Sequence, residues 1–270
     1  MPLFRLISVT FFLTLCLGTR FALAQSTDTS VFGKQQASEA ALVGVLYDLK
    51  QTQQHKPTTM SLHDYNQVVD EFLSKNWDES VLNRYYRGTR ALYTTQIFIP
   101  LMDASGGPRA IGEEKLIKPS FWLIHYKGQV APPSDGTWRF WGYGGEICSV
   151  AVDGKTVLVA NHSYVKTPRT AWRSKEPPGQ PAGSGQLVAG DWIHLKAGQV
   201  VDLDILIGER GGGSFDCFLL IEKQGQTYGT TGSHPLFPVF QLAPYATPAP
   251  KSPKVAPQFA PNGPVWKAFQ

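Results

Sequence analysis

The segment 126–159 constrains the fold of this chain more than any other, because its apolar and polar residues alternate with a period of two. Trp138 and Phe140 alternate with Arg139 and Trp141, and a second alternating run follows at 147–152. This period is typical of a β-strand with one face in a core. The pair Asp153-Gly154 then separates two such runs, and it favours the positive φ angles of a tight hairpin turn. The segment therefore predicts antiparallel β-hairpins.

Further apolar runs extend this pattern, so that roughly eight to ten strands are expected between residues 41 and 222. They lie at 41–49, 92–99, 121–126, 186–195, 200–207 and 216–222. Pro100 is expected to end the second of these runs, since proline has no N–H to donate to a β-ladder. Asp202 and Asp204 share one face of their strand, and that face is interpreted as solvated. We therefore expect a mostly β domain over residues 41–232.

Residues 61–87 interrupt the β pattern and are predicted to be a helical insertion. Ser61 can cap a helix, and Asp64 three residues later completes a capping box. Apolar residues then recur at helical spacing, at Leu62, Tyr65, Val68, Val69, Phe72 and Leu73. Asp78 is expected to start a second short helix, and the apolar stripes of both helices are expected to face the core.

The two ends of the chain differ from this domain. Arg5 precedes an apolar run, and Ala22-Leu23-Ala24 forms a small-x-small cleavage site, so residues 1–24 are predicted to be a signal peptide. The protein is then exported, to the periplasm or beyond the cell. The apolar run is shorter than the about 20 residues of a membrane span, so no span is expected. Residues 25–40 are polar and are expected to be flexible.

Prolines become frequent from residue 235 onward, so residues 233–270 are expected to form an extended Pro-rich tail. The part 235–245 is apolar enough to dock on the domain, whereas residues 246–264 are expected to stay mobile. The tail is also a candidate segment for binding a protein partner.

Composition and motifs exclude several functions. The formal charge is +4 over 270 residues with no Lys/Arg run, so nucleic acid is not an expected partner. The six histidines are scattered and form no close metal-ligand spacing, and no Gly-x-Ser-x-Gly motif occurs. The sequence therefore predicts no catalytic residues, no metal site and no cofactor.

Several short motifs, in this order, resemble the protective-antigen fourteen-kilodalton (PA14) module. They are Gly-x-x-Tyr-Asp at 44–48, Ser-Asp-Gly-Thr-Trp-Arg-Phe at 134–140, Val-Asp-Gly-Lys-x-Val at 152–157 and Ile-x-Leu-x-Ala-Gly at 193–198. The resemblance spans about residues 41–222. It implies a two-sheet antiparallel β-sandwich that binds carbohydrate in several members. The early Tyr-Asp-Leu-Lys and the late run at 211–220 are also similar to exported proteins of unassigned role in Planctomycetes and Verrucomicrobia.

Lectin-type members of this family hold calcium with an adjacent Asp-Asp pair, and the calcium ion contacts the sugar. This chain has Gly144-Gly145-Glu146 at that place. One carboxylate is a poor ligand set for an ion that takes about six to eight oxygens. Any sugar binding is therefore expected to be independent of metal.

The resemblance places the ligand on loops at one end of the sandwich, where 143–146 and 209–216 are rich in glycine. The candidate ligand-binding residues are Trp141, Tyr143, Gly144, Gly145, Glu146 and Asp216. The two aromatic rings would stack on sugar, the carboxylates would accept hydrogen bonds, and the glycine N–H groups would meet hydroxyls. The alternative is an aromatic cluster covered by the tail or the helices, and the exposure of Trp141 and Tyr143 distinguishes the two.

Cys148 and Cys217 each share a strand face with apolar residues, so they are expected to lie close together in the core. Export makes a disulfide between them feasible, and a pair of free thiols that packs as small hydrophobic groups is the alternative.

The whole chain is thus interpreted as an exported, non-catalytic module that binds a carbohydrate or another cell-envelope component. The alternative is a structural or scaffolding protein that makes protein contacts.

Overall fold

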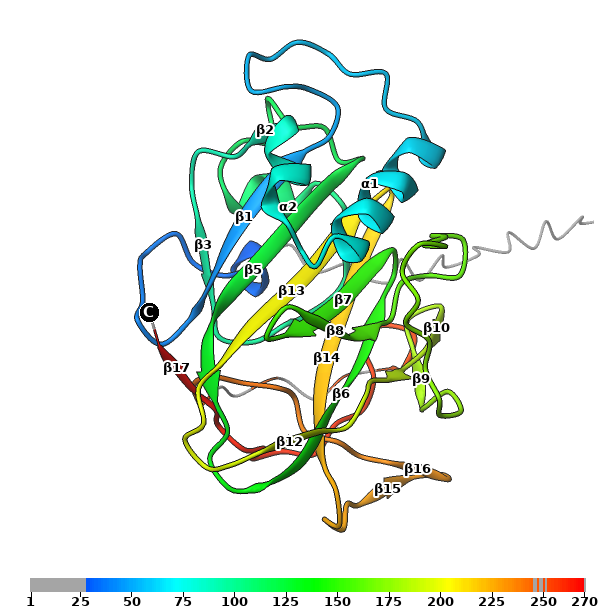
Figure 1. Ribbon diagram of the computed structural model, residues 1–270. Helices are drawn as coiled ribbons and strands as arrows, with labels where there is room; N and C mark the ends of the chain where they lie inside the picture. Colours follow the sequence, from blue (N-terminus) through cyan, green and yellow to red (C-terminus); the bar gives the residue numbers. More distant parts are fainter. Residues whose placement is uncertain (1–27, 245–246, 248–249, 251, 270) are drawn as a thin grey trace, which may run out of the picture.

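The computed structural model describes residues 28–244, 247, 250 and 252–269 of the chain (Figure 1). Within these residues, two antiparallel sheets pack face to face as a β-sandwich, and a helical layer covers the outer face of the larger sheet. The mostly β sandwich predicted from the sequence is confirmed. The predicted signal peptide at 1–24 lies outside the described residues.

The larger sheet has the strand order β2-β1-β5-β13-β7-β8, and in the described chain β3 also pairs with β1 and β17 with β5. The bounds are β1 Leu42–Asp48, β2 Tyr86–Arg87, β3 Leu92–Thr94, β5 Trp122–Ala131, β7 Ile147–Val152, β8 Lys155–Val159, β13 Val201–Glu209 and β17 Lys267–Phe269. The turn between β7 and β8 has φ of 49° at Asp153 and 71° at Gly154. This is the positive-φ hairpin turn that the sequence predicts.

The smaller sheet has the order β11-β6-β14-β4, and among the described strands β12 also pairs with β6. The bounds are β4 Phe98–Asp103, β6 Gly136–Gly144, β11 Val188–Ala189, β12 Ile193–Leu195 and β14 Ser214–Lys223. The short ribbons are β9 Pro181–Ala182 with β10 Gly185–Gln186, and β15 Thr230–Thr231 with β16 His234–Pro235.

Pro100 does not end its strand, so that prediction is wrong. β4 runs through Pro100 and ends at Asp103. β4 lies at the edge of the smaller sheet, and its register with β14 shifts between Phe215 and Cys217. An edge position at a bulge tolerates a residue without an N–H donor.

The main core lies between the two sheets and explains the alternation in the sequence. Trp138 and Phe140 of β6 point into it, together with Val150 of β7 and Ile205 of β13. Each of these side chains is almost fully buried. Burial of one such side chain stabilises the fold by roughly 1.5–3 kcal/mol.

Cys148 and Cys217 face one another in this core as free, fully buried thiols. Burial raises the pKa of the Cys217 thiol well above its usual value, and a hydrogen bond with Cys148 adds to the effect. Both side chains therefore pack as small hydrophobic groups.

The helical insertion covers the outer face of the larger sheet (Figure 1). It contains helix α1 Leu62–Ser74 and the 3-10 helix η2 Glu79–Arg84. The predicted capping box is present, because the Ser61 hydroxyl accepts the Asp64 N–H and the Asp64 carboxylate accepts the Ser61 N–H. Tyr65 and Phe72 of α1 share a second apolar cluster with Leu123 of β5 and Leu206 of β13. The central strands are therefore buried on both faces.

The outer face of β13 is not fully solvated, which corrects the interpretation of Asp204. Its carboxylate lies 2.8 Å from Nε2 of the buried His125 on β5. On the other side of the ring, Nδ1 of His125 lies 3.3 Å from the Glu79 carboxylate of η2. Asp204 thus takes part in joining the helical layer to the sheet.

Residues 28–34 pack on the sandwich, in contrast to the flexible segment expected at 25–40, whereas the side chains at 35–40 are exposed and residues 25–27 lie outside the described residues. The packed part contains the 3-10 helix η1 Thr29–Phe32, near the short helix α2 Gly106–Ala110. The Phe32 ring is fully buried and stacks on Phe215 with centroids 5.6 Å apart. Packing of Phe32 and Val31, together with the backbone pairing of Lys34 with Tyr93, docks this segment on the sandwich.

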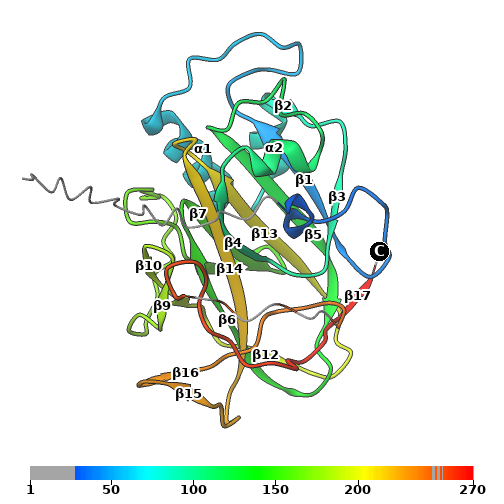
Figure 2. The ribbon, with the colours of Figure 1, turned by 180° about the vertical axis from the view of Figure 1, so that it is seen from behind.

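The Pro-rich tail crosses the outer face of the smaller sheet (Figure 2). The docking expected for its first part is confirmed, since Phe237, Val239, Phe240 and Leu242 are buried. The expected mobile spacer is not seen at 252–264, where Ala256 is buried against this face. Trp266 then enters the main core, and β17 adds a strand beside β5. The described part of the tail has no apolar core of its own, so its contacts with the sandwich hold it in place.

Candidate functional site

The two glycine-rich loops expected to form a ligand site do meet at one cleft of about 910 Å³. One loop joins β6 to β7, and the other joins β13 to β14. We call it the Glu209 cleft; its lining residues include Gly145, Glu146, Tyr164, Glu209, Gly211 and Asp216. Ser184 and Lys254 contribute from the β9–β10 ribbon and from the tail. The site thus joins segments that are far apart in the sequence.

Three carboxyl groups give the cleft its chemistry. Glu146, Glu209 and Asp216 are all buried, with Glu209 only 1% exposed. Burial raises the pKa of Glu209 to about 7, and the Glu146 charge adds to the effect. Burial also raises the pKa of Asp216 to about 7. The folded protein therefore holds acids that are difficult to ionise, because water is largely excluded from them.

One carboxylate oxygen of Glu209 accepts hydrogen bonds, and the other has no hydrogen-bond partner among the described residues. Its Oε1 accepts the N–H groups of Gly211 and Gly212 at 2.8 and 2.6 Å. Its Oε2 is buried and accepts no hydrogen bond from any described residue. A buried acceptor without a donor is costly, by roughly 1–3 kcal/mol. This oxygen belongs to a side chain that lines the cleft, so it is an unpartnered acceptor close to a ligand bound there.

The position of the Asp216 carboxyl group requires glycine at two positions that lie beside it. A Cβ atom at Gly145 would lie 2.2 Å from Oδ1 of Asp216, and one at Gly183 would lie 2.3 Å from Oδ2. Only glycine allows the backbone to approach the carboxyl group so closely. The N–H of Gly144 donates to Ala160 and that of Gly145 to the Asp216 carbonyl. These two N–H groups are therefore not available to a ligand, which corrects the role expected for them.

Trp141 and Tyr143 do not form a sugar-stacking surface in this structure. They are only 6% and 4% exposed, and they belong to the apolar cluster under the tail. The Trp141 Nε1–H donates to Glu222, and the Tyr143 ring stacks on Phe218. The covered aromatic cluster, which was the alternative interpretation, is what the structure contains.

Tyr164 is the exposed aromatic residue of the cleft, and it is not among the candidate residues predicted from the sequence. It is 39% exposed and lines the cleft wall. Its hydroxyl donates to Oε1 of Glu146, and the guanidinium carbon of Arg210 lies 4.2 Å from the ring centroid. Tyr164 lies in the long loop between β8 and β9, which has no periodic pattern. Its only sequence signal is an aromatic ring in a polar loop.

The described residues contain no group of three or more His, Cys, Asp or Glu side chains arranged to hold a metal ion. Within the same residues, no helix combines the length and the apolar composition of a membrane span.

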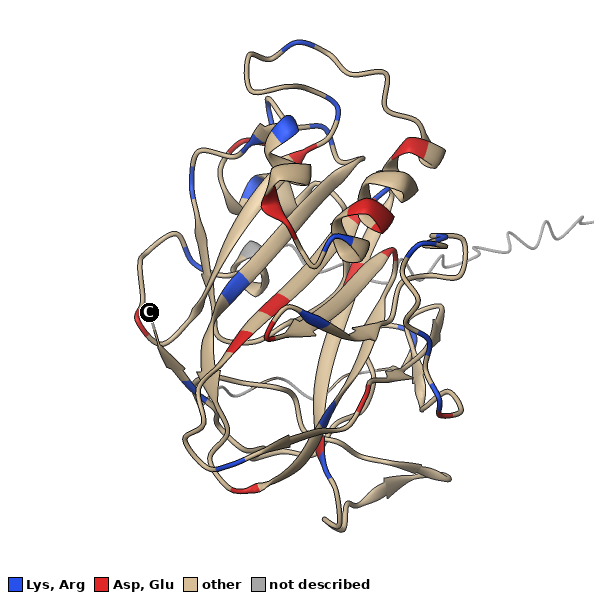
Figure 3. Cartoon of the chain, in the orientation of Figure 1, with Lys and Arg blue, Asp and Glu red and all other residues tan. Residues whose placement is uncertain are grey.

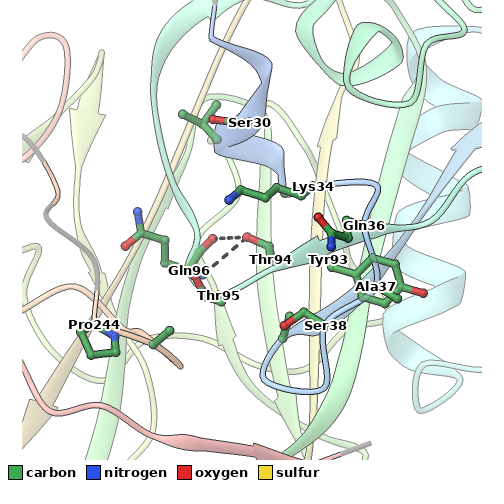
Figure 4. A pocket seen from close by; sticks show the side chains of 14 residues that line it. Ser30, Lys34, Gln36, Ala37, Ser38, Tyr93, Thr94, Thr95, Gln96 and Pro244 are labelled. Carbon is green, nitrogen blue, oxygen red and sulfur yellow. Dashed lines mark hydrogen bonds between the residues drawn. The ribbon is translucent and has the colours of Figure 1, made fainter.

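Another pocket, of about 440 Å³, lies between the N-terminal segment, β3 and the start of the tail (Figure 4). Its polar groups are neutral except for Lys34, and the Thr94 hydroxyl donates to the Gln96 carbonyl at 2.7 Å. None of the buried polar atoms without a partner in the described chain belongs to it. This pocket therefore has no buried hydrogen-bond acceptor without a partner among its described residues, whereas the Glu209 cleft has such an acceptor.

No protein-family model and no curated protein matches this chain. Solved structures do show similarity, at low identity. The PA14 domain of an antifreeze protein has a TM-score of 0.44 and 12% identity, covering 77% of this chain and 90% of that one. A PA14 sugar-binding domain from an RTX adhesin has a TM-score of 0.42 and 13% identity, covering 75% and 95%.

An anti-sigma factor domain-containing protein from Clostridium clariflavum has a TM-score of 0.43 and 14% identity, and covers 81% of this chain. This chain spans about half of that protein, 49% of its length. The described residues form a mostly β, antiparallel sandwich with few helices. PA14 domains are among the structures similar to it.

Proposed function

We propose that this chain is an exported, non-catalytic binding module, and that the Glu209 cleft holds a carbohydrate or another hydroxyl-rich component of the cell envelope. The observation that carries the proposal is the buried, unpartnered Oε2 of Glu209 in the cleft wall. A ligand hydroxyl that donates to this oxygen would remove its desolvation cost. A hydrogen bond to this oxygen contributes about 0.5–1.5 kcal/mol when the carboxyl group is neutral and about 1.5–3 kcal/mol when it is ionised.

The other lining groups fit the same ligand class. Asp216 offers a buried carboxyl that forms no hydrogen bond with any described side chain or backbone group. Tyr164 supplies the exposed edge of a ring that already packs against the His162 ring, with centroids 3.8 Å apart, and against the Arg210 guanidinium. Without a metal, such a site relies on hydrogen bonds and on contact with the edge of this one ring. Weak, metal-independent affinity follows.

The alternative is a scaffolding protein whose Pro-rich tail binds a protein partner. The tail would then have to leave the sandwich, because Phe237 and Val239 are buried against it. Detachment would expose this apolar surface and Trp141 beneath it. We therefore favour the cleft over the tail as the binding element.

A screen of the full chain against a glycan array, with and without chelator, tests the proposal. We expect a hit that chelator leaves unchanged and that Glu209→Gln weakens by about tenfold in Kd. Tyr164→Ala should also weaken it. Glu114→Gln, at an exposed carboxylate away from the cleft, is the matched control. Unchanged affinity in both cleft variants, with folds intact, would refute the assignment.

A further inference from the structure

A second cleft, of about 660 Å³, lies beside the C-terminal end of α1 and is lined by positive charge. Its cationic side chains are Lys155, Arg169, Arg173 and Lys175, and Asp191 is the one carboxylate that lines it in the described chain. Figure 3 shows several Lys and Arg positions along the loop between β8 and β9, from which three of the four come. We call this site the basic cleft.

The positive charges of the basic cleft are largely uncompensated. The side chains of Lys155 and Arg169 are exposed and form no hydrogen bond or ion pair with any described residue. Arg173 donates only to the backbone carbonyls of Thr170 and Trp172. Lys175 is 86% exposed and lies 4.0 Å from Asp191. Four cations thus face solvent, and Asp191 is the one carboxylate among the described residues that line the cleft, which favours an anionic ligand.

A buried carboxylate of α1 holds the loop that carries these cations. The Asp70 side chain accepts the N–H groups of Arg169 and Thr170 and the Thr170 hydroxyl, each at 2.9 Å. Asp70 is itself buried. Charge-assisted hydrogen bonds of this kind are strong. The backbone at 169–170 is therefore fixed in place before any ligand binds.

The basic cleft also contains an aromatic ring of defined orientation. Trp172 is half-buried, and its Nε1–H donates to Oδ2 of Asp191 at 3.0 Å. One edge of the indole is thereby fixed, and the ring lines the cleft among the cations. Guanidinium and ammonium groups beside an indole ring suit a sugar ring that carries carboxylate or sulfate groups.

From this arrangement we infer that the basic cleft binds an acidic glycan chain through its carboxylate or sulfate groups. The cations pair with the anionic groups, and Trp172 contacts a sugar ring. Near-balanced net charge and the small number of cations fit a short acidic segment better than the long phosphate backbone of a nucleic acid. This site is separate from the Glu209 cleft, whose three carboxyls would repel the same ligand once ionised.

Calorimetric titration of the full chain with polygalacturonate, heparin oligosaccharides, dextran and single-stranded DNA tests the inference. Polygalacturonate carries carboxylates and heparin carries sulfates as well, so the pair distinguishes the two anionic groups. At least one of them should bind, with an affinity that falls as salt rises, and uncharged dextran should not. The double variant Lys155→Gln/Arg169→Gln should weaken Kd by roughly 10- to 100-fold.

Lys115→Gln/Lys118→Gln removes two exposed lysines elsewhere and should bind as the parent chain does. Glu209→Gln should leave acidic-glycan binding unchanged, which separates this site from the proposed carbohydrate cleft. Equal affinity of the Lys155/Arg169 variant and the parent would overturn the inference. So would dextran binding of equal strength, or DNA binding tighter than either acidic glycan.

Discussion

The indole of Trp141 lies against the ring of Phe237, with centroids 5.1 Å apart and planes 20° apart. This contact joins the outer face of β6 to the Pro-rich tail, and Tyr228 packs edge-on against the same phenylalanine. A ring that the sequence analysis assigns to ligand stacking is thereby used to hold the tail. The tail is consequently part of the fold.

Phe237→Ala is expected to destabilise the protein by about 3–5 kcal/mol, because it removes a buried ring from the cluster under the tail. Thermal or urea unfolding measures the change. Leu236→Ala, at a half-buried neighbour, should cost much less. Equal effects of the two substitutions would mean that the tail does not pack as described.

Trp141→Ala should act on stability in the same way and leave ligand affinity intact. Its indole is buried and forms its hydrogen bond with Glu222 inside the protein. We expect the Trp141→Ala protein to unfold at a lower temperature than the parent and to bind with unchanged affinity in the glycan screen. Loss of affinity without loss of stability would restore Trp141 as a ligand contact.

The acids of the Glu209 cleft should make the protein more stable in mild acid than near neutrality. The pKa of Glu209 is about 7 in the folded protein and about 4.5 when unfolded. Its contribution is therefore fully present below pH 4.5 and is lost as pH rises through 7. Asp216 acts in the same direction. Ionisation costs the folded state roughly 3 kcal/mol at Glu209 and roughly 4 kcal/mol at Asp216.

Glu209→Gln should reduce this pH dependence, since an amide keeps an acceptor for Gly211 and Gly212 but does not ionise. Urea unfolding of both proteins across the pH range measures it. The variant should be the more stable protein at about pH 8, even though its ligand affinity is lower. A variant that is less stable at every pH would contradict the raised pKa.

Asp204→Asn should loosen the helical layer in a pH-dependent way. Burial lowers the pKa of His125, but hydrogen bonds to Asp204 and Glu79 outweigh this and raise it overall. The stability that protonated His125 gives is present below pH 6.5 and is lost as pH rises through the raised folded value. The variant should therefore lose about 1–3 kcal/mol near pH 6 and much less at high pH.

NMR titration of His125 is the second measurement for Asp204→Asn. The midpoint of this titration should be lower in the variant than in the parent protein. Asp202→Asn, two residues away on the same face, is the matched control, because Asp202 is exposed and does not contact the ring. A His125 midpoint that does not move in Asp204→Asn would exclude the carboxylate as its partner.

In reduced protein, Cys148 and Cys217 should resist alkylation until the protein unfolds, because both thiols are fully buried and the pKa of Cys217 is raised. Mass spectrometry before and after denaturation measures this. The disulfide that an oxidising compartment would allow stays a prediction. Non-reducing mass spectrometry of exported protein decides it, since two intact thiols would exclude the bridge.

Local patterns in the sequence determined the strands, the hairpin turn and the helix start. Trp138 and Phe140 alternate with polar or outward residues, and Asp153-Gly154 adopts the positive φ that its chemistry favours. Ser61 and Asp64 form the capping box within four residues. Each of these features depends on neighbours in the chain, so a reader of the sequence can find them.

What lies on the outer faces was decided only by the tertiary structure. Trp141 and Tyr143 were correctly placed opposite the core, but the chain returns about a hundred residues later to cover them. Glu146, Tyr164 and Glu209 meet in one cleft because the β6–β7, β8–β9 and β13–β14 loops converge there. Such contacts depend on where distant segments come to rest, and no period or short motif in the sequence encodes that.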